Sequence, residues 1–151
     1  MSVVIDDRQR HVPIPVPRLA RAAQRALDAL GRPDSDVDVA VVDDRAIRTL
    51  NAAHRGIRRR TDVLAFPLEL PGTVSGLFGQ VVISADTAAR QARRAGVPVA
   101  LELELLTTHG VLHLAGYDDR DPVEAELMHR RERDLLGSAA PSRLWKGLLR
   151  S

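Results

Sequence analysis

The sequence contains no cysteine among its 151 residues. This absence excludes disulfide bonds and thiolate metal sites, so a bound metal ion would need histidine, aspartate or glutamate ligands. Aromatic residues make up only 3% of the chain, which leaves little material for stacking on nucleic-acid bases. The first residues also lack a basic start followed by an apolar run, so we expect no secretion signal.

Long apolar runs and lysine are scarce as well. No apolar stretch approaches the roughly 20 residues that a membrane-spanning helix requires, so we expect no membrane partner and a cytoplasmic location. Lys146 is the only lysine, although lysine and arginine together number 22. Arginine binds phosphate oxygens in pairs, but a general excess of arginine also arises from codon usage. Only local clusters of arginine therefore count as evidence of a phosphate site.

The residues that are present predict one α+β domain over residues 1–151. Hydrophobic residues make up 44% of the chain and charged residues 28%, which is typical of a globular domain with a single core. Alternating or β-branched segments predict strands, and apolar residues at helical spacing predict helices. The expected strands are 2–6, 37–43, 61–67 and 80–84, and the expected helices are 19–30, 44–53, 85–95, 98–115 and 122–136. We therefore expect a small mixed sheet with helices packed on it.

The stretch HGVLHLAGYDD holds two histidines, His109 and His113, at a spacing of four residues. On a helix this spacing puts both side chains on one face, about 5–6 Å apart at Cβ, where both can reach one ion. Gly116 can end the helix and let the chain return. The chain would then present Asp118 or Asp119 to the same ion. We interpret this pattern as a metal site; the alternative is a buried helix with two incidental histidines.

The residue after the first histidine argues against a metalloprotease. Those enzymes place a general-base glutamate directly after the first histidine of the helical pair. Here that position is Gly110, which has no side chain to accept a proton. The histidine pair therefore indicates a metal site of another kind.

A cluster of arginines lies in the stretch HRGIRRRTD, between a predicted helix and a predicted strand. It contains Arg55, Arg58, Arg59 and Arg60. The ordinary interpretation of such a run is a solvated basic loop. The alternative is a surface that contacts RNA phosphates without reading the base sequence.

Three blocks of this sequence resemble the YbeY family of rRNA maturation endoribonucleases. The stretch HGVLHLAGYDD is similar to the family signature H-G-x-L-H-L-x-G-Y-D-H, and the EAELM that follows fits E-A-x-x-M. LNAAHRGIRRRTDVLAFP resembles L-N-x-x-Y-R-x-x-x-x-P-T-D-V-L-S-F-P, and GQVVIS resembles G-D-I-x-I-S. The blocks follow the family's order and extend over roughly residues 37–136.

The resemblance implies a fold, an activity and a set of site residues. It implies one α+β domain in which the metal-binding helix lines a cleft. The implied activity is a single-strand-specific, metal-dependent endoribonuclease that acts on rRNA at the small ribosomal subunit, in 3′-end maturation and in ribosome quality control. The implied metal ligands are His109, His113 and the residue at the family's third histidine position, which is Asp119 here. Arg55 matches the family's catalytic arginine beside the metal, and the implied cofactor is one divalent metal ion, with zinc expected.

Several positions depart from the family pattern. Aspartate can bind zinc at about 2.0–2.2 Å, so Asp119 preserves a site, but its charge lowers the acidity expected of a bound water and suits oxygen-preferring metals such as manganese. The other departures are His54, Arg60, Ala65 and Gln80. Two other functions stay open: a metal-dependent hydrolase of another substrate, and a ribosome-assembly factor that binds RNA without catalysis. The sequence also leaves open whether the ion activates water or polarises a phosphate oxygen.

The remaining polar residues suggest ordinary surface roles. We expect His11 and His129 to be exposed, with His129 as the alternative third ligand in place of Asp119. We interpret Glu102 and Glu104 as a solvent-facing edge of the histidine helix. We expect Trp145 to be the packing anchor of a loosely held C-terminal helical tail.

Overall fold

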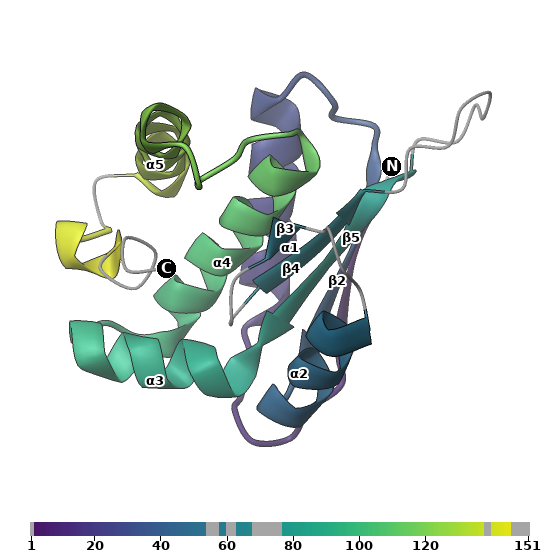
Figure 1. Ribbon diagram of the computed structural model, residues 1–151, viewed down its shortest axis with the longest axis vertical. Helices are drawn as coiled ribbons and strands as arrows, with labels where there is room; N and C mark the ends of the chain where they lie inside the picture. The colour runs from purple at the N-terminus through teal and green to yellow at the C-terminus, as the bar shows by residue number, and fades with distance from the viewer. Residues whose placement is uncertain (1, 54–57, 60–62, 68–76, 138–139, 146–151) are drawn as a thin grey trace.

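A mixed β-sheet forms the centre of the protein (Figure 1). The computed structural model describes residues 2–53, 58–59, 63–67, 77–137 and 140–145. Within these residues the sheet has five strands in the order β1-β2-β5-β4-β3. The strands are β1 Ser2–Asp7, β2 Asp36–Val42, β3 Arg58–Arg59, β4 Val63–Pro67 and β5 Leu77–Ser84. β1 and β5 run parallel to β2, β4 runs antiparallel to β5, and β3 runs antiparallel to β4.

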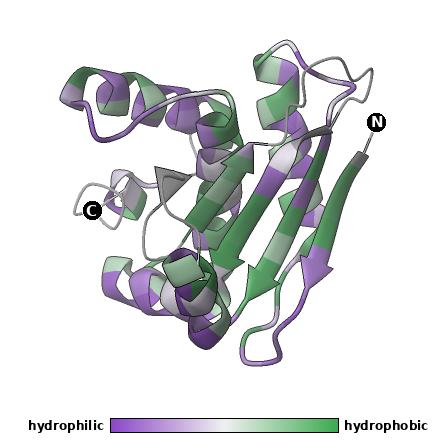
Figure 2. Ribbon diagram, turned by 45° about the vertical axis from the view of Figure 1, so that its right-hand side comes forward, coloured by the Kyte–Doolittle hydropathy of each residue, from purple (hydrophilic) through white to green (hydrophobic). Residues whose placement is uncertain are grey.

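Helices cover both faces of this sheet unequally. The described helices are α1 Val16–Ala29, α2 Asp44–Ala53, α3 Ala85–Ala95, α4 Val99–Leu114, α5 Pro122–Leu136 and the short 3₁₀ helix η1 Ser142–Trp145. Strand residues alternate between the faces, so Val39 and Val41 join the large core with α1, α3 and α4, whereas Ala40 and Val42 join a smaller cluster with α2. Figure 2 shows the resulting pattern, with a largely hydrophobic sheet and helices of mixed hydropathy around it.

α4 is the central helix of the large core. Every residue from Glu102 to Leu114 is buried, because α1, α3, α5 and the sheet all pack against this helix. Gly110 allows the closest approach to the sheet. A Cβ atom at Gly110 would lie 2.4 Å from Cγ1 of Val81 on β5, so no larger residue fits there unless the helix moves. The helix that carries both histidines therefore packs closely against the sheet.

The structure confirms the predicted α+β class, the mixed sheet and the helices packed on it. α1 begins at Val16, earlier than predicted, because Pro17 occupies its first turn, where a missing N–H costs nothing. The two-residue strand β3 lies in the stretch interpreted as a basic loop. The structure confirms Trp145 as a packing anchor, since its side chain is buried and lies in η1. No helix in the described part of the chain combines the length and the apolar character that crossing a membrane requires.

Candidate metal site

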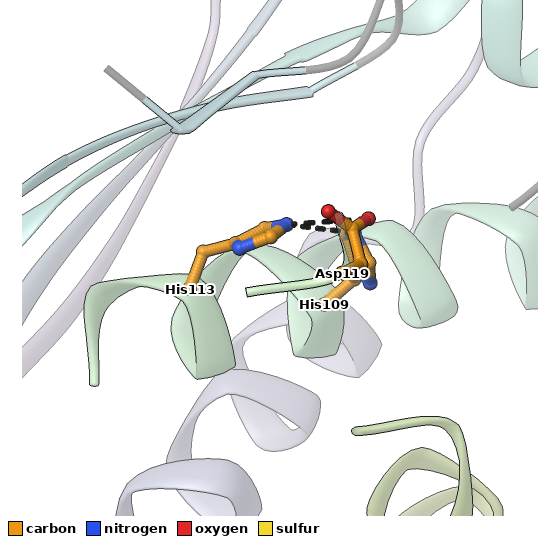
Figure 3. Close-up of side chains that lie close together, drawn as sticks. All are labelled: His109, His113 and Asp119. Carbon is orange, nitrogen blue, oxygen red and sulfur yellow. Dashed lines mark hydrogen bonds and ion pairs between the residues drawn. The ribbon is translucent and has the colours of Figure 1, made fainter. Parts of the chain in front are cut away.

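Three side chains converge at the C-terminal end of α4 (Figure 3). His109 and His113 project from successive turns of α4, and Asp119 comes from the loop that follows. The two Nε2 atoms lie 2.9 Å apart, and Oδ2 of Asp119 lies 3.3 Å from Nε2 of His109 and 3.7 Å from Nε2 of His113. The structure therefore brings together the three residues that the sequence predicted as ligands, and this group could hold a metal ion.

A glycine turn brings the aspartate back to the helix. Gly116 has a φ of +100°, a conformation that favours glycine, and its N–H donates to the carbonyl of His113 at 3.0 Å. The side chain of Asp118 binds Arg120 instead: its carboxylate accepts hydrogen bonds from the backbone N–H and the guanidinium of Arg120, each at 3.0 Å. The turn therefore directs Asp119, and not Asp118, toward the histidines.

The outer hydrogen bonds fix which nitrogen of each imidazole carries the proton. Nδ1 of His113 lies 2.9 Å from the backbone carbonyl of Tyr117, which can only accept, so this nitrogen donates. Nδ1 of His109 lies 2.6 Å from Oε2 of Glu132 and donates in the same way. In the neutral rings both Nε2 atoms therefore carry lone pairs. They face Oδ2 of Asp119, which is buried and receives no hydrogen bond.

Three electron-pair donors that face one another in this way could share a metal ion. Atoms bound to one tetrahedral ion at about 2.0–2.2 Å lie roughly 3.3–3.6 Å from one another. The two nitrogen–oxygen separations, 3.3 and 3.7 Å, are close to this range, whereas the two nitrogens, 2.9 Å apart, are closer than this range. Two imidazoles and a carboxylate suit zinc and similar divalent ions. The residues present therefore fit a metal ion.

The charges around the site are strongly coupled. Burial alone would lower the pKa of His109, but Glu132 and Asp119 outweigh it and raise this pKa to about 9. Burial alone would raise the pKa of Glu132, but the charge and hydrogen bond of His109 and the hydrogen bond of His129 lower it to about 2. Burial alone would raise the pKa of Asp119, but the hydrogen bonds and charges of His109 and His113 hold this pKa well below its usual range. Without a metal, a proton on His109 thus supplies the missing positive charge.

The sequence did not predict that a buried glutamate, Glu132, lies behind His109. Glu132 on α5 is fully buried, and its Oε1 accepts hydrogen bonds from Nδ1 of His129 at 2.9 Å and from Nε1 of Trp145 at 3.0 Å. The expectation that His129 is exposed was therefore wrong, because this face of α5 packs against α4. The available signal was the spacing of three between His129 and Glu132, which places both on one helical face.

Two further surface interpretations were wrong and one is confirmed. Glu102 and Glu104 are buried instead of solvent-facing. Glu104 lies against α1, where its carboxylate is 2.7 Å from the guanidinium of Arg18, so it belongs to the interface between α1 and α4. His11 is exposed as expected, with its side chain 62% accessible and Nδ1 3.0 Å from Asp86.

The predicted phosphate-binding residue lies outside the described residues. Arg55 belongs to the stretch 54–57, and Arg60 to the stretch 60–62. Arg58 and Arg59 are described only as the backbone of β3. The role of Arg55, and the cleft that it was expected to line beside α4, remain predictions.

Comparison with known proteins gives concordant matches. The family model described as "Endoribonuclease YbeY" matches residues 4–140. The chain is 47% identical over 118 residues to an Endoribonuclease YbeY of Anaeromyxobacter dehalogenans, in a match that covers 78% of this chain and 61% of that protein. It is 41% identical over 140 residues to the Endoribonuclease YbeY of Geobacter metallireducens, where the match covers 89% of this chain and 93% of that protein.

The fold also matches a solved structure. The solution structure of TM1509 from Thermotoga maritima superposes with a TM-score of 0.59 and covers 98% of this chain and 91% of that chain. The two sequences are 24% identical, so this likeness concerns the fold alone.

Proposed function

The chain belongs to the YbeY family, and from this premise we propose that it is a metal-dependent, single-strand-specific endoribonuclease. We propose rRNA as its substrate, with action at the small ribosomal subunit in 3′-end maturation and in ribosome quality control, in the cytoplasm. The names of its relatives support endonuclease activity on RNA. The single observation that supports metal dependence is the convergence of His109, His113 and Asp119 into a group that could hold a metal ion, in which Oδ2 of Asp119 is buried and lacks a hydrogen-bond partner.

The proposed roles follow from chemistry and position. His109, His113 and Asp119 would hold one divalent ion, and we propose zinc because two of the three ligands are imidazoles. Such an ion supplies Lewis acidity toward water or a phosphate oxygen. Arg55 would bind the scissile phosphate and offset the charge that develops there during cleavage.

The first test measures metal content and RNA cleavage together. Purified protein is analysed for bound zinc and manganese and then incubated with a structured rRNA fragment, with and without a chelator. We expect about one ion per chain, cleavage in single-stranded segments, and loss of cleavage on chelation with recovery on adding metal. Bound metal without cleavage of any RNA would favour a hydrolase of another substrate. RNA binding without metal or cleavage would favour an assembly factor, and either result would refute the proposal.

The second test concerns Arg55. Arg55→Ala should reduce cleavage by about 10²-fold or more, the scale of losing one transition-state donor, with the melting temperature within a few degrees of the parent. Arg94→Ala is the matched control, because Arg94 is exposed on α3 and should leave cleavage unchanged. A large loss of stability with normal specific activity would instead identify Arg55 as a structural residue.

A further inference from the structure

Behind the metal site, one buried carboxylate joins three parts of the chain. Glu132 is on α5, His109 is on α4, and Trp145 is in η1. All three side chains are at most 1% exposed. Oε2 of Glu132 is 2.6 Å from Nδ1 of His109, and Oε1 is 3.0 Å from Nε1 of Trp145. His129 also binds Oε1, at 2.9 Å.

We propose that Glu132 and Trp145 together act as positioning residues that fix the tautomer of His109 and so keep its Nε2 lone pair available to a metal ion. This inference rests on the proposed function, because it concerns the same metal site. Histidine ligands commonly donate their second N–H to a carboxylate, which orients the ring and strengthens the ligand. The new element is the role of Trp145, a residue from the C-terminal segment that acts on His109 through Glu132.

The argument for Trp145 follows from what each group can donate. An indole N–H is a donor only, and it cannot reverse its role as a histidine nitrogen can. Whatever replaces Glu132 must therefore present an acceptor toward Trp145. The carboxylate has an acceptor at both ends, so it satisfies Trp145 at Oε1 and still accepts from Nδ1 of His109 at Oε2. A group with only one acceptor end cannot do both.

The substitution Glu132→Gln makes this requirement visible. The amide oxygen should face Trp145 and His129, which leaves the NH₂ group facing Nδ1 of His109. Two donors cannot hydrogen-bond each other, so Nδ1 must become the acceptor and the ring proton must move to Nε2. There the N–H would point at Nε2 of His113, 2.9 Å away, and block the lone pair that the ion needs. Glu132→Gln therefore keeps the shape of the side chain at position 132 but holds His109 in the tautomer whose Nε2 cannot bind the ion.

Zinc affinity, measured by competition with a chromophoric chelator, is the first readout. Glu132→Gln should bind zinc about 10–100-fold more weakly than the parent, the usual cost of losing an outer-shell partner. The matched control is Glu126→Gln, the same chemical change at an exposed position of α5, which should bind like the parent.

The double variant separates positioning from a merely structural role. Adding Trp145→Phe to Glu132→Gln removes the obligatory donor, so the amide can turn its oxygen toward His109 and its NH₂ toward His129. We expect the double variant to bind zinc more tightly than Glu132→Gln alone, although it carries one more core substitution. A structural role for Trp145 predicts the opposite, and a double variant that binds no better than the single one would overturn the proposal.

Imidazole ¹⁵N spectra of the metal-free protein at alkaline pH give an independent readout. The parent should show His109 protonated at Nδ1, and Glu132→Gln should show it protonated at Nε2. An unchanged tautomer together with an unchanged zinc affinity would also overturn the proposal. If the parent protein binds no zinc but the His109 tautomer still differs between the parent and Glu132→Gln, the positioning inference is supported and the proposed metal-dependent function is refuted.

Discussion

Two partly buried aspartates, Asp44 and Asp119, stand in opposite hydrogen-bonding situations. At Asp44, Oδ1 accepts from the hydroxyls of Ser84 and Thr87, each at 2.6 Å, and Oδ2 accepts from the guanidinium of Arg90 at 2.8 Å. At Asp119, Oδ2 is buried with no hydrogen-bond donor and faces two imidazole nitrogens. Both carboxylates have lowered pKa values, yet their neighbours differ in kind.

The difference separates a structural cluster from a candidate binding site. Asp44 is complete within the protein, because every described partner donates to it and the cluster ties α2 to α3. Asp119 is incomplete without a positive charge, because its neighbours present lone pairs in their neutral form. Buried polar groups are normally satisfied, so the absence of a hydrogen-bond partner at Oδ2 of Asp119, beside two imidazoles, fits a group that could hold an ion. A lowered pKa alone would not have separated the two sites.

The largest effect is expected when both histidines are removed from the cluster of His109, His113 and Asp119. His109→Ala combined with His113→Ala should remove nearly all bound metal, because one carboxylate cannot hold the ion alone. His11→Ala is the matched control, since His11 is exposed and bonded to Asp86, and should retain the parent metal content. Equal metal content in the double variant and the parent, measured by elemental analysis, would refute the site.

The next effect compares the two adjacent aspartates of the turn. Asp119→Asn should weaken zinc binding by at least the roughly 10–100-fold typical of losing an outer-shell partner, because it removes a direct ligand charge. Asp118→Asn should keep its metal, since Asp118 is bonded to Arg120. The reverse result in a chelator competition would identify Asp118 as the third ligand.

A related substitution tests what the aspartate contributes. Asp119→His replaces an anionic oxygen ligand with a neutral imidazole, so the preference of the site should shift toward zinc and away from manganese. If the ion activates water, the midpoint of the pH–activity profile should be lower in Asp119→His than in the parent. Unchanged metal preference and an unchanged midpoint would show that Asp119 does not contact the ion.

The zinc affinity of the site should depend steeply on pH between neutrality and about pH 9. The pKa of His109 is raised to about 9 in the metal-free protein, so an ion must displace a proton below that pH. Zinc affinity should therefore rise by about tenfold per pH unit from neutrality and level off above about 9. Titrations at several pH values check this, and a flat profile between pH 7 and 9 would contradict the raised pKa.

The smallest expected effect concerns the complete cluster. Asp44→Asn should lower the free energy of unfolding by about 1–2 kcal/mol, because it weakens hydrogen bonds to a charged group, while metal content stays the same. Burial opposes the shift, but Arg90, Ser84 and Thr87 lower the pKa of Asp44 from 3.8 to about 2. Its contribution is thus present above pH 3.8 and lost as the pH falls through 2. Acid denaturation curves should show this loss in the parent and not in Asp44→Asn.

The sequence predicted the parts of the site that depend on local spacing. His109 and His113 follow from helical geometry, and Gly116 from the need for a turn after the helix. The spacing between His129 and Glu132 placed both on one helical face, but it did not show that this face is buried, because the run HRRERD around them suggests a solvated face. Its burial depends on how α5 packs against α4, which is a tertiary contact. Trp145 was predicted as an anchor, but its hydrogen bond to Glu132 depends on where the chain folds back.

The three candidate ligands differ in burial and in the element that carries them, which bears on the kinetics of metal exchange. The side chains of His109 and His113 are 0% and 2% exposed and belong to a helix at the centre of the core, whereas Asp119 is 14% exposed and lies on a loop. Loops open at a small cost in free energy, whereas core helices open only near global unfolding. A bound ion should therefore leave after Asp119 swings away, while both imidazoles stay in place. The residence time of such an ion would then depend on the short turn after Gly116, and not only on the helix that carries the histidines.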